Sequence, residues 1–293
     1  MTASGDGARA RSQRGAALLL VMWMIALLAA LVGGFALTAR IESMQGRVLS
    51  RGIVAGQAAR AGVEYAMTRV TDPDPALQWL PDGRPYRWMF DDAEVTIRIV
   101  DESGKIDLNG ADVALLSALI RAVEAEQAQA DAVAAAIVDW RDSDVLSQPQ
   151  GGAEDPQYAA AGRPYGAKDA PFETVAEVEQ VLGMTPELFA KIARQLTVYS
   201  GEAQPNQQYA DATVLQAMGV DPAPILAGRE QTSAVPGQPA ITGSGSGTYS
   251  IDARARLPDR RESVLRVVVR AGASGVPGSV YTPLGWEEGA TSR

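Results

Sequence analysis

The sequence AALLLVMWMIALLAALVGGFALTA, residues 16–39, contains no charged side chain. As an α-helix it would be about 36 Å long, which is enough to cross the ~30 Å hydrocarbon core of a bilayer. A short leader precedes it, carries Arg9, Arg11 and Arg14, and ends at Gly15. Because positively charged flanks stay on the cytoplasmic side, the sequence predicts one membrane-spanning helix with a cytoplasmic N-terminus and a translocated main domain.

The helical pattern continues beyond the apolar segment. No proline occurs between Arg40 and Val70, and apolar residues recur there at helical spacing among charged ones. These apolar positions include Met44, Val48, Val63, Met67 and Val70. The two prolines of the following segment, residues 72–75 (DPDP), cannot continue a helix. We therefore expect one helix up to residue 70, apolar on all sides in its first half and amphipathic in its second.

The composition limits the chemistry that this chain can perform. Its 293 residues include neither cysteine nor histidine, and the formal net charge is −9. Disulfides, thiolate metal sites and mechanisms that need a Ser/His or Cys/His pair are therefore excluded. The acidic balance also disfavours binding to nucleic acid.

Strands and helices follow the first helix in a distinctive order. Alternating apolar residues predict three strands, at 94–100, 248–257 and 263–270. Helical spacing predicts four helices between the first two strands, at 111–129, 131–140, 174–182 and 186–196. A turn is expected at 81–83 and a loop at 141–169. The sequence thus predicts an α+β fold: a long N-terminal helix packed on an antiparallel sheet, with a large inserted all-helical domain.

An internal similarity lies in and after the predicted insert. Residues 111–119 (ADVALLSAL) and 210–218 (ADATVLQAM) share the pattern A-D-x-x-Φ-L-x-A-Φ, and an asparagine precedes each, Asn109 or Asn206. The similarity is either chance between two alanine-rich helices or the trace of two related small helical modules. A Gly-, Ser- and Pro-rich stretch at 228–247 predicts a flexible loop after the second copy.

The junction between the leader and the apolar helix resembles the leader of type IV pilins and pseudopilins. In that family a prepilin peptidase cuts after the glycine and methylates the new N-terminus, which implies cleavage after Gly15 and methylation of Ala16. Periodicity alone leaves an uncleaved signal anchor as the alternative. Most pilins carry glutamate as the fifth mature residue, where this chain has Leu20. That glutamate is thought to offset the N-terminal amine of a neighbouring subunit, so a subunit without it suits the end of a filament.

The missing glutamate, the segment RGAALLLVMWMIALLAAL and the hexapeptide AGVEYA at 61–66 resemble the K-type minor pseudopilins of the type II secretion system. The resemblance implies a non-enzymatic subunit that caps the pseudopilus tip and helps to initiate its assembly for protein export. It implies a single pass through the inner membrane with the main domain in the periplasm. The implied partners are the I- and J-type minor pseudopilins and the prepilin peptidase, but no nucleic acid. The partner-facing residues would be Leu18, Leu20, Val21, Ile25 and Leu28.

The resemblance also implies a division of the chain into parts with a pilin-like fold and parts without it. The expected parts are a prepilin leader at 1–15, a transmembrane and filament-core helix at 16–39, a pilin-like domain at 40–105 and 248–293, an inserted SAM-like helical domain at 106–200, and a second small helical module with the flexible loop at 201–247.

Carboxylates are densest in two nearby segments, residues 139–144 (DWRDSD) and 151–155 (GGAED). Oxygen ligands from loops suit a hard cation such as calcium, although D-x-D loops are also common on solvated surfaces. In the K-type family, similar W-x-D-x-D and G-A-E-D segments belong to a calcium-binding loop. The resemblance therefore implies a structural calcium that orders the loop at 141–169, with Asp139 facing the core or ending a helix. The implied ligands are Asp142, Asp144, Glu154 and Asp155.

Two alternative functions remain open, one based on these carboxylates and one on two other segments. The paired carboxylates could act as acid and base for glycosidic hydrolysis, in a signal-anchored cell-wall hydrolase. The segments 106–109 (IDLN) and 182–184 (LGM) are similar to helix-hairpin-helix modules of DNA-binding competence proteins, which grip phosphates with glycine amides and basic side chains. The low aromatic content, 6%, disfavours the first alternative, and the excess of acidic residues disfavours the second.

Overall fold

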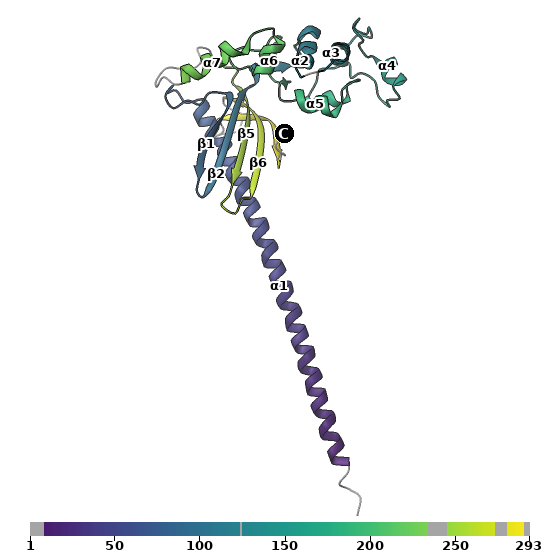
Figure 1. Ribbon diagram of the computed structural model, residues 1–293, viewed down its shortest axis with the longest axis vertical. Coiled ribbons are helices and arrows are strands. Elements are labelled where there is room, and N and C mark those ends of the chain that lie inside the picture. The colour runs from purple at the N-terminus through teal and green to yellow at the C-terminus, as the bar shows by residue number, and fades with distance from the viewer. Residues whose placement is uncertain (1–8, 124, 234–244, 273–279, 290–293) are drawn as a thin grey trace, which may run out of the picture. The chain divides into compact units, whose positions relative to one another are not determined.

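The computed structural model describes residues 9–123, 125–233, 245–272 and 280–289. The chain forms two compact units, residues 1–54 and 55–293. Helix α1 (Arg9–Val70) makes up the described part of the first unit and continues into the second (Figure 1). Most of the expected prepilin leader, residues 1–8, lies outside the described residues.

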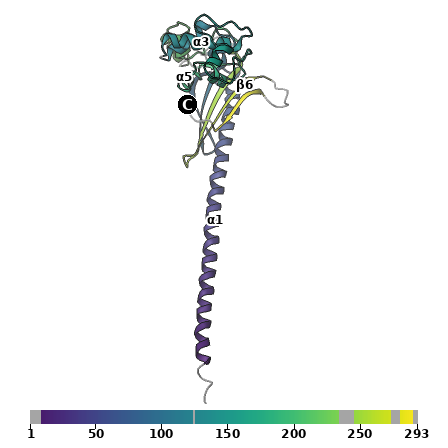
Figure 2. The same ribbon diagram turned by 90° about the vertical axis from the view of Figure 1, so that its right-hand side faces the viewer.

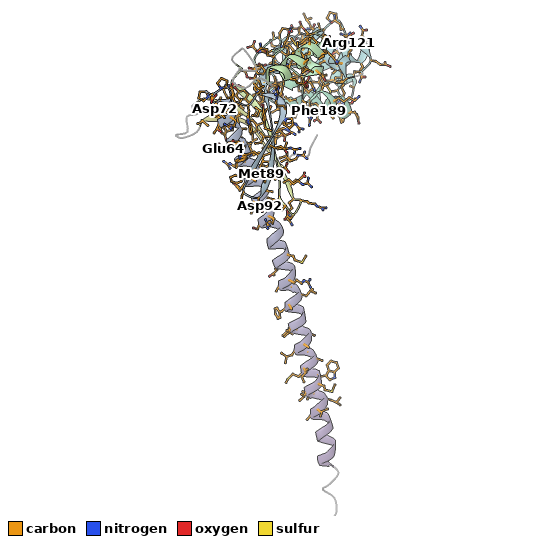
Figure 3. All side chains as sticks on the ribbon, turned by 60° about the vertical axis from the view of Figure 1, so that its left-hand side comes forward. Glu64, Asp72, Met89, Asp92, Arg121 and Phe189 are labelled. Carbon is orange, nitrogen blue, oxygen red and sulfur yellow. The ribbon has the colours of Figure 1, made fainter. Side chains whose placement is uncertain are left out.

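The first half of α1 is long and apolar enough to cross a membrane. The segment Ala17–Arg40 has a mean hydropathy of 2.6, and none of it is buried within the chain. Figure 3 shows side chains projecting from this part of the helix on several sides. Apolar side chains exposed in this way need lipid or other helices around them. The predicted apolar helix is therefore present, and the rest of the described chain does not cover it.

α1 ends at Val70, as the sequence predicts. The chain then turns, and the Asp72 carboxylate accepts a hydrogen bond from the backbone N–H of Asp74 (3.0 Å). Asp74 in turn accepts one from the N–H of Ala76 (2.9 Å). Such side-chain bonds to the backbone two residues ahead stabilise turns in competition with helix. Together with the two prolines, they explain why the helix ends here.

A five-stranded antiparallel sheet packs on the last turns of α1 (Figures 1 and 2). The strand order is β1-β2-β5-β6-β7. The strands are β1 (Asp82–Phe90), β2 (Ala93–Asp101), β5 (Thr248–Arg256), β6 (Glu262–Ala271) and β7 (Tyr281–Glu288). The described helices other than α1 all lie between β2 and β5 in the chain. The predicted α+β fold with an inserted helical domain is confirmed.

Small residues on α1 allow the helix to approach the sheet closely. The buried face of α1 in this unit consists of Ala55, Ala58, Ala59, Val63, Ala66, Met67 and Val70. A Cβ atom at Gly62 would lie only 2.7 Å from Val95 Cγ1, so a side chain at this position would push the helix away from the sheet. Burial of these apolar faces against each other is the main stabilising term of the pilin-like part.

The sequence predicts three strands, whereas the sheet has five. β1 begins where a turn is expected, at 81–83, and its Pro85 is tolerated because β1 is an edge strand. Tyr86 and Trp88 on β1 stack on aromatic rings of their surroundings, which favours the strand. β7 is the other edge strand, and Pro283 and Gly285 interrupt the strand pattern of its sequence. Alternation of apolar residues does not reveal either edge strand, because neither strand buries one complete face.

The helical insert forms a second apolar core. Its elements are α2 (Val113–Ala122), α3 (Gln127–Arg141), α4 (Asp155–Ala160), the 3₁₀ helix η2 (Val175–Gln180), α5 (Pro186–Ile192), α6 (Ala212–Ala217) and α7 (Pro222–Ser233). One continuous core includes buried residues from Ile106 to Ala217. The expected SAM-like domain at 106–200 and the small module at 201–247 thus share a single core.

Several predicted boundaries in the insert are wrong. The helix expected at 111–129 ends at Ala122, because α2 and α3 pack as a hairpin in which Ser117 donates a hydrogen bond to Asp131 (2.5 Å). Neither glycine nor proline marks that break in the sequence. The loop expected at 141–169 contains α4, and the helix expected at 174–182 is the 3₁₀ helix η2. α7 extends to Ser233 and so occupies the start of the stretch expected to be a flexible loop, whose residues 234–244 lie outside the described residues.

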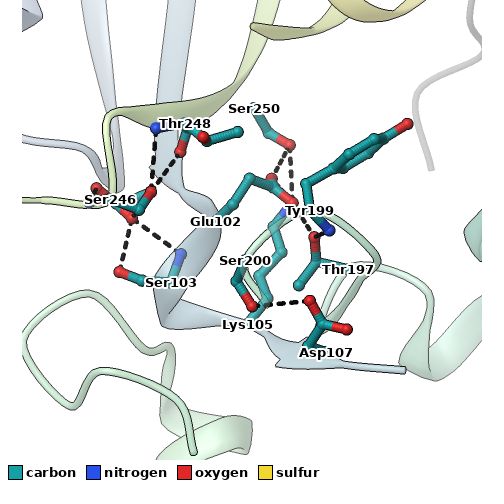
Figure 4. A network of polar contacts seen from close by, with 11 residues as sticks. Glu102, Ser103, Lys105, Asp107, Thr197, Tyr199, Ser200, Ser246, Thr248 and Ser250 are labelled. Atoms are coloured by element: carbon teal, nitrogen blue, oxygen red, sulfur yellow. Dashed lines mark hydrogen bonds and ion pairs between the residues drawn. The ribbon is translucent and has the colours of Figure 1, made fainter. Parts of the chain in front are cut away.

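A buried polar network joins the insert to the sheet (Figure 4). The 3₁₀ helix η1 (Glu102–Gly104) follows β2 directly, and Glu102 is 1% exposed. Its Oε1 accepts hydrogen bonds from Lys105 Nζ (2.5 Å) and from the hydroxyl of Ser250 on β5. Its Oε2 accepts one from the hydroxyl of Thr197. Thr197 belongs to the short strand β4 (Leu196–Thr197), which pairs in parallel with β3 (Ile106–Asp107). Both ends of the insert are therefore tied to one carboxylate.

Candidate metal centre

Three acidic residues converge where α3 ends and α4 begins. Asp142 is the C-terminal capping residue of α3, Asp144 follows two residues later, and Glu154 is the N-terminal capping residue of α4. Each offers a carboxylate oxygen, and these oxygens all lie within 4.8 Å of one another. The structure thus brings together three of the four acids expected as calcium ligands, although the sequence separates Asp144 from Glu154 by a loop.

Two carboxylate oxygens of this cluster are buried without a hydrogen-bond partner. Glu154 is 4% exposed, and its Oε1 has no partner in the part of the chain that the structure describes. The same holds for Oδ1 of Asp142. An unpaired buried carboxylate oxygen costs several times the free energy of an ordinary hydrogen bond. A positively charged or donating group from outside the described residues would satisfy these two atoms.

The carboxyl groups of Glu154 and Asp142 both have raised pKa values. Burial raises the pKa of Glu154, the neighbouring carboxylates of Asp139 and Asp142 add to this shift, and together these causes bring the pKa to about 7. Burial also raises the pKa of Asp142, and the charge of Asp144 adds to this shift. Like charges held together without a counterion favour the protonated form. A cation at this position would favour the ionised carboxylates and so oppose both shifts.

Asp139 lies near the cluster, and its carboxylate binds the backbone of the loop that follows α3. It is fully buried on α3, and both of its oxygens lie 3.2 Å from the backbone N–H of Gln148. A Cβ atom at Gly152 would lie 2.0 Å from Asp139 Oδ2, so only glycine fits against this carboxylate. Asp139 is therefore core-facing and anchors the segment that leads to Glu154, in agreement with the expectation from the sequence.

Asp155, the fourth expected ligand, does not lie in the cluster. It is the first residue of α4 and is exposed, and its carboxylate packs over the backbone of Gly166. A different acid comes close instead. The charge of Asp169 raises the pKa of both Asp142 and Glu154. Asp169 closes the loop that begins at Arg141, and no spacing rule in the sequence singles it out.

The donor set suits a hard cation. Calcium prefers several oxygen ligands in loop geometry, and the cluster supplies carboxylate oxygens from two separate loop ends. Three aromatic rings nearby are buried: Trp140 is 4% exposed, Phe172 3% and Tyr158 0%. These rings pack on one another within the core. A fourth ring, Tyr165, contacts Trp140 and Tyr158 and is partly exposed.

The expected functional residues of the N-terminal helix lie in the other unit. Gly15 and Ala16 fall within α1, in a part whose side chains lie outside the described residues. The expected partner-facing residues are all exposed, by 51% to 70%: Leu18, Leu20, Val21, Ile25 and Leu28.

The part of the chain that contains the acidic cluster matches a known family. Residues 98–201 match the family model described as Type II secretion system (T2SS), protein K. The whole fold is similar to a chain in the crystal structure of the GspK-GspI-GspJ complex of the enterotoxigenic Escherichia coli type 2 secretion system, with a TM-score of 0.59 and 15% identity. This match covers 85% of the present chain and 100% of the other. No curated protein sequence matches the chain. Residues 98–201 are therefore similar to protein K of the type II secretion system, and the predicted resemblance of the chain to the K-type pseudopilins is confirmed.

Proposed function

We propose that this protein is a non-enzymatic minor pseudopilin that occupies the tip of a type II secretion pseudopilus and helps to initiate its assembly. The observation that carries the proposal is the position of the segment 98–201, which matches protein K. It interrupts a pilin-like unit between β2 and β5, while α1 supplies an apolar helix that is exposed on all sides. The GspK-GspI-GspJ complex supports I- and J-type pseudopilins as partners.

The position at the tip is supported by the charge of the apolar helix. After cleavage behind Gly15, the mature helix would begin at Ala16 and carry no acidic side chain before residue 40. A subunit stacked above would bury its N-terminal amine against this helix without a counterion, because Leu20 stands where a glutamate would be. The same helix would first lie in the inner membrane, with the N-terminus in the cytoplasm and the second unit in the periplasm.

N-terminal sequencing and co-purification test the central proposal. We expect the membrane-extracted protein to begin at methylated Ala16 and to co-purify with I- and J-type pseudopilins through contacts of residues 18–28. Recovery of a chain that retains residues 1–15 and never associates with pilin-like subunits would contradict it. A peptidase-deficient strain is the control for the processing step.

The substitution Leu20→Glu tests the role of the missing acid. We expect the helix still to insert in the membrane, since one glutamate near the end of a span costs a few kcal/mol at most. Tip assembly should be disturbed, because the new carboxylate would accept a further subunit above. Unaltered secretion and unaltered complexes with the I- and J-type subunits would contradict this role, and Leu20→Gln is the matched uncharged control.

The acidic cluster supports a structural calcium as part of this function. Asp142, Asp144 and Glu154 would hold the ion, and Asp169 lies close enough to contribute to its electrostatic field. Bound calcium would neutralise the buried carboxylates and order the loop between α3 and η2. The convergence of three acids beside buried aromatic rings favours an ion site over the acid and base of a cell-wall hydrolase.

Limited proteolysis and thermal unfolding with and without calcium test the ion site. We expect calcium to protect the segment 142–171 from cleavage and to raise the melting temperature of the protein. Magnesium is the control, because it demands a stricter octahedral geometry and should protect less. Unchanged proteolysis and an unchanged melting temperature at saturating calcium would contradict the site.

A further inference from the structure

The internal similarity of the sequence corresponds to a structural duplication. Each copy begins with a turn in which residue Asp107 or Asn206 bonds the N–H two residues ahead, and its carbonyl accepts from the N–H groups three and four residues ahead. Each copy then has an aspartate, Asp112 or Asp211, that caps a helix by accepting from the N–H three residues on, at 2.8 Å in both cases. The two helices, α2 and α6, pack against each other. This equivalence of hydrogen bonds goes beyond chance similarity between alanine-rich helices.

Each copy is closed by an arginine from a later helix. Arg141, the last residue of α3, donates to the carbonyl oxygen of Leu108 and to that of Ala111 (2.6 Å). Arg229 on α7 donates to the carbonyls of Gln207 (2.5 Å) and Ala210 (2.7 Å). These acceptors occupy the same two positions of the two turns. Burial lowers the pKa of both arginines, which shows that both are partly removed from water.

Only the first copy is attached to the acidic loop. Arg141 directly precedes Asp142, so the group that closes the turn also fixes the start of the loop. Asn109 in the same turn fixes the end of the loop, since its side chain donates to the carbonyl of Phe172 (2.9 Å) and accepts from its N–H (2.7 Å). The residue equivalent to Asn109 in the second copy is Gln208, which is exposed.

From this arrangement we infer that Arg141 and Asn109 are positioning residues of the metal centre. They lie outside the cluster but clamp both ends of the loop, 142–171, that carries its carboxylates. The inference rests on the proposed calcium site and adds to it the residues that preorganise it. Outer residues that orient metal ligands typically contribute 10- to 100-fold to affinity, so loss of either clamp should weaken calcium binding by about 10-fold.

Calcium titration calorimetry on the full-length protein in detergent tests this inference, with calcium alone as the probe. The variants are Arg141→Met and Asn109→Ala, and the matched controls are Arg229→Met and Gln208→Ala. We expect the first pair to weaken calcium binding by about 10-fold and the controls to leave it unchanged. Hydrogen exchange of residues 142–171 in saturating calcium gives a second measurement, in which only the first pair should lose protection.

The outcomes separate the inference from the proposed site. If the unmodified protein binds no calcium, both are overturned. If it binds calcium and Asn109→Ala leaves the affinity unchanged, the positioning role alone is overturned. Equal weakening by Arg141→Met and Arg229→Met would also overturn it, because the effect would then be a general loss of stability. Asn109→Ala retains the arginine clamp and so keeps the test valid if Arg141→Met reduces the amount of folded protein.

Discussion

Two regions of the segment 98–201 each bury a glutamate, and the two carboxylates differ in their hydrogen-bond partners. Glu102, at the junction with the sheet, is 1% exposed, and each of its oxygens accepts at least one hydrogen bond. Glu154, in the metal centre, is 4% exposed, and its Oε1 has no partner among the described residues. Since desolvation is similar, the difference lies in the partners. The junction satisfies its glutamate within the chain, whereas an oxygen of Glu154 has no partner among the described residues and would be satisfied by the proposed ion.

The largest effect should come from removing the charge of Glu102. Glu102→Gln keeps the size of the side chain but leaves Lys105, whose side chain is 14% exposed, without its counterion. Breaking a buried ion pair from one side costs about 3–5 kcal/mol, and we expect a loss of that size in the free energy of unfolding. Denaturant unfolding in the presence and absence of calcium measures it. The increment that calcium adds should remain the same.

Ser250→Ala is the control for this first prediction. It removes the hydrogen bond that Ser250 donates to Glu102 and the one that it accepts from Lys105 (2.7 Å), but no charge, and should cost about 2 kcal/mol. A loss from Glu102→Gln no larger than that of the control would contradict the view of the junction as a buried ion pair. Loss of the calcium increment would show that the two regions are not independent.

The sequence predicts the pilin-like part better than the insert. The alternation from Val95 to Ile99 identifies β2, because one face of that strand is completely buried. The same reasoning misses β1 and β7, whose positions at the sheet edges leave no complete apolar face. In the insert, the break between α2 and α3 follows from tertiary packing of the hairpin and has no local signal.

The sequence predicts part of the acidic cluster but not all of it. Asp142 and Asp144 are neighbours in sequence, and the resemblance to the K-type family links them to Glu154. Asp155 is adjacent to Glu154, yet it begins helix α4 and turns towards Gly166 instead. Adjacent residues at a helix start point in different directions, so spacing alone cannot assign both to one ion. Asp169 lies three residues before Phe172, whose backbone forms two hydrogen bonds with Asn109, and this long-range contact has no local signal in the sequence.

The second prediction also replaces a buried glutamate with glutamine, but the expected change in stability has the opposite sign. Glu154→Gln removes a buried charge whose Oε1 has no partner among the described residues, so the metal-free protein should be as stable as the unmodified one or more stable. The calcium increment, about 2.7 kcal/mol when calcium is at 100 times its dissociation constant, should be lost. Chemical unfolding with calcium and with a chelator measures both quantities.

Asp155→Asn is the matched control for Glu154→Gln. It changes the adjacent acid, which is exposed and lies outside the cluster, and should leave the calcium increment intact. If both variants lost the increment equally, the ion would be held by the α4 start as a whole. If Glu154→Gln lowered metal-free stability as strongly as Glu102→Gln, the contrast between the two buried glutamates would be wrong.

The last prediction is a pH dependence of the metal-free protein to which Glu154 should contribute. Its pKa is raised from the ordinary value of 4.5 to about 7, so the folded state binds the proton more tightly than the unfolded state does. Stability therefore falls as the pH rises from about 4.5 to about 7, and the penalty is complete above that range. Calcium needs the deprotonated carboxylate, so the stability that calcium adds should grow over the same range. Without calcium, the melting temperature should therefore fall as the pH rises from 5 to 8. With calcium, it should change less over the same range. Comparison with Glu154→Gln isolates this group, and an equal slope in both metal-free proteins would assign the pH dependence to other carboxylates.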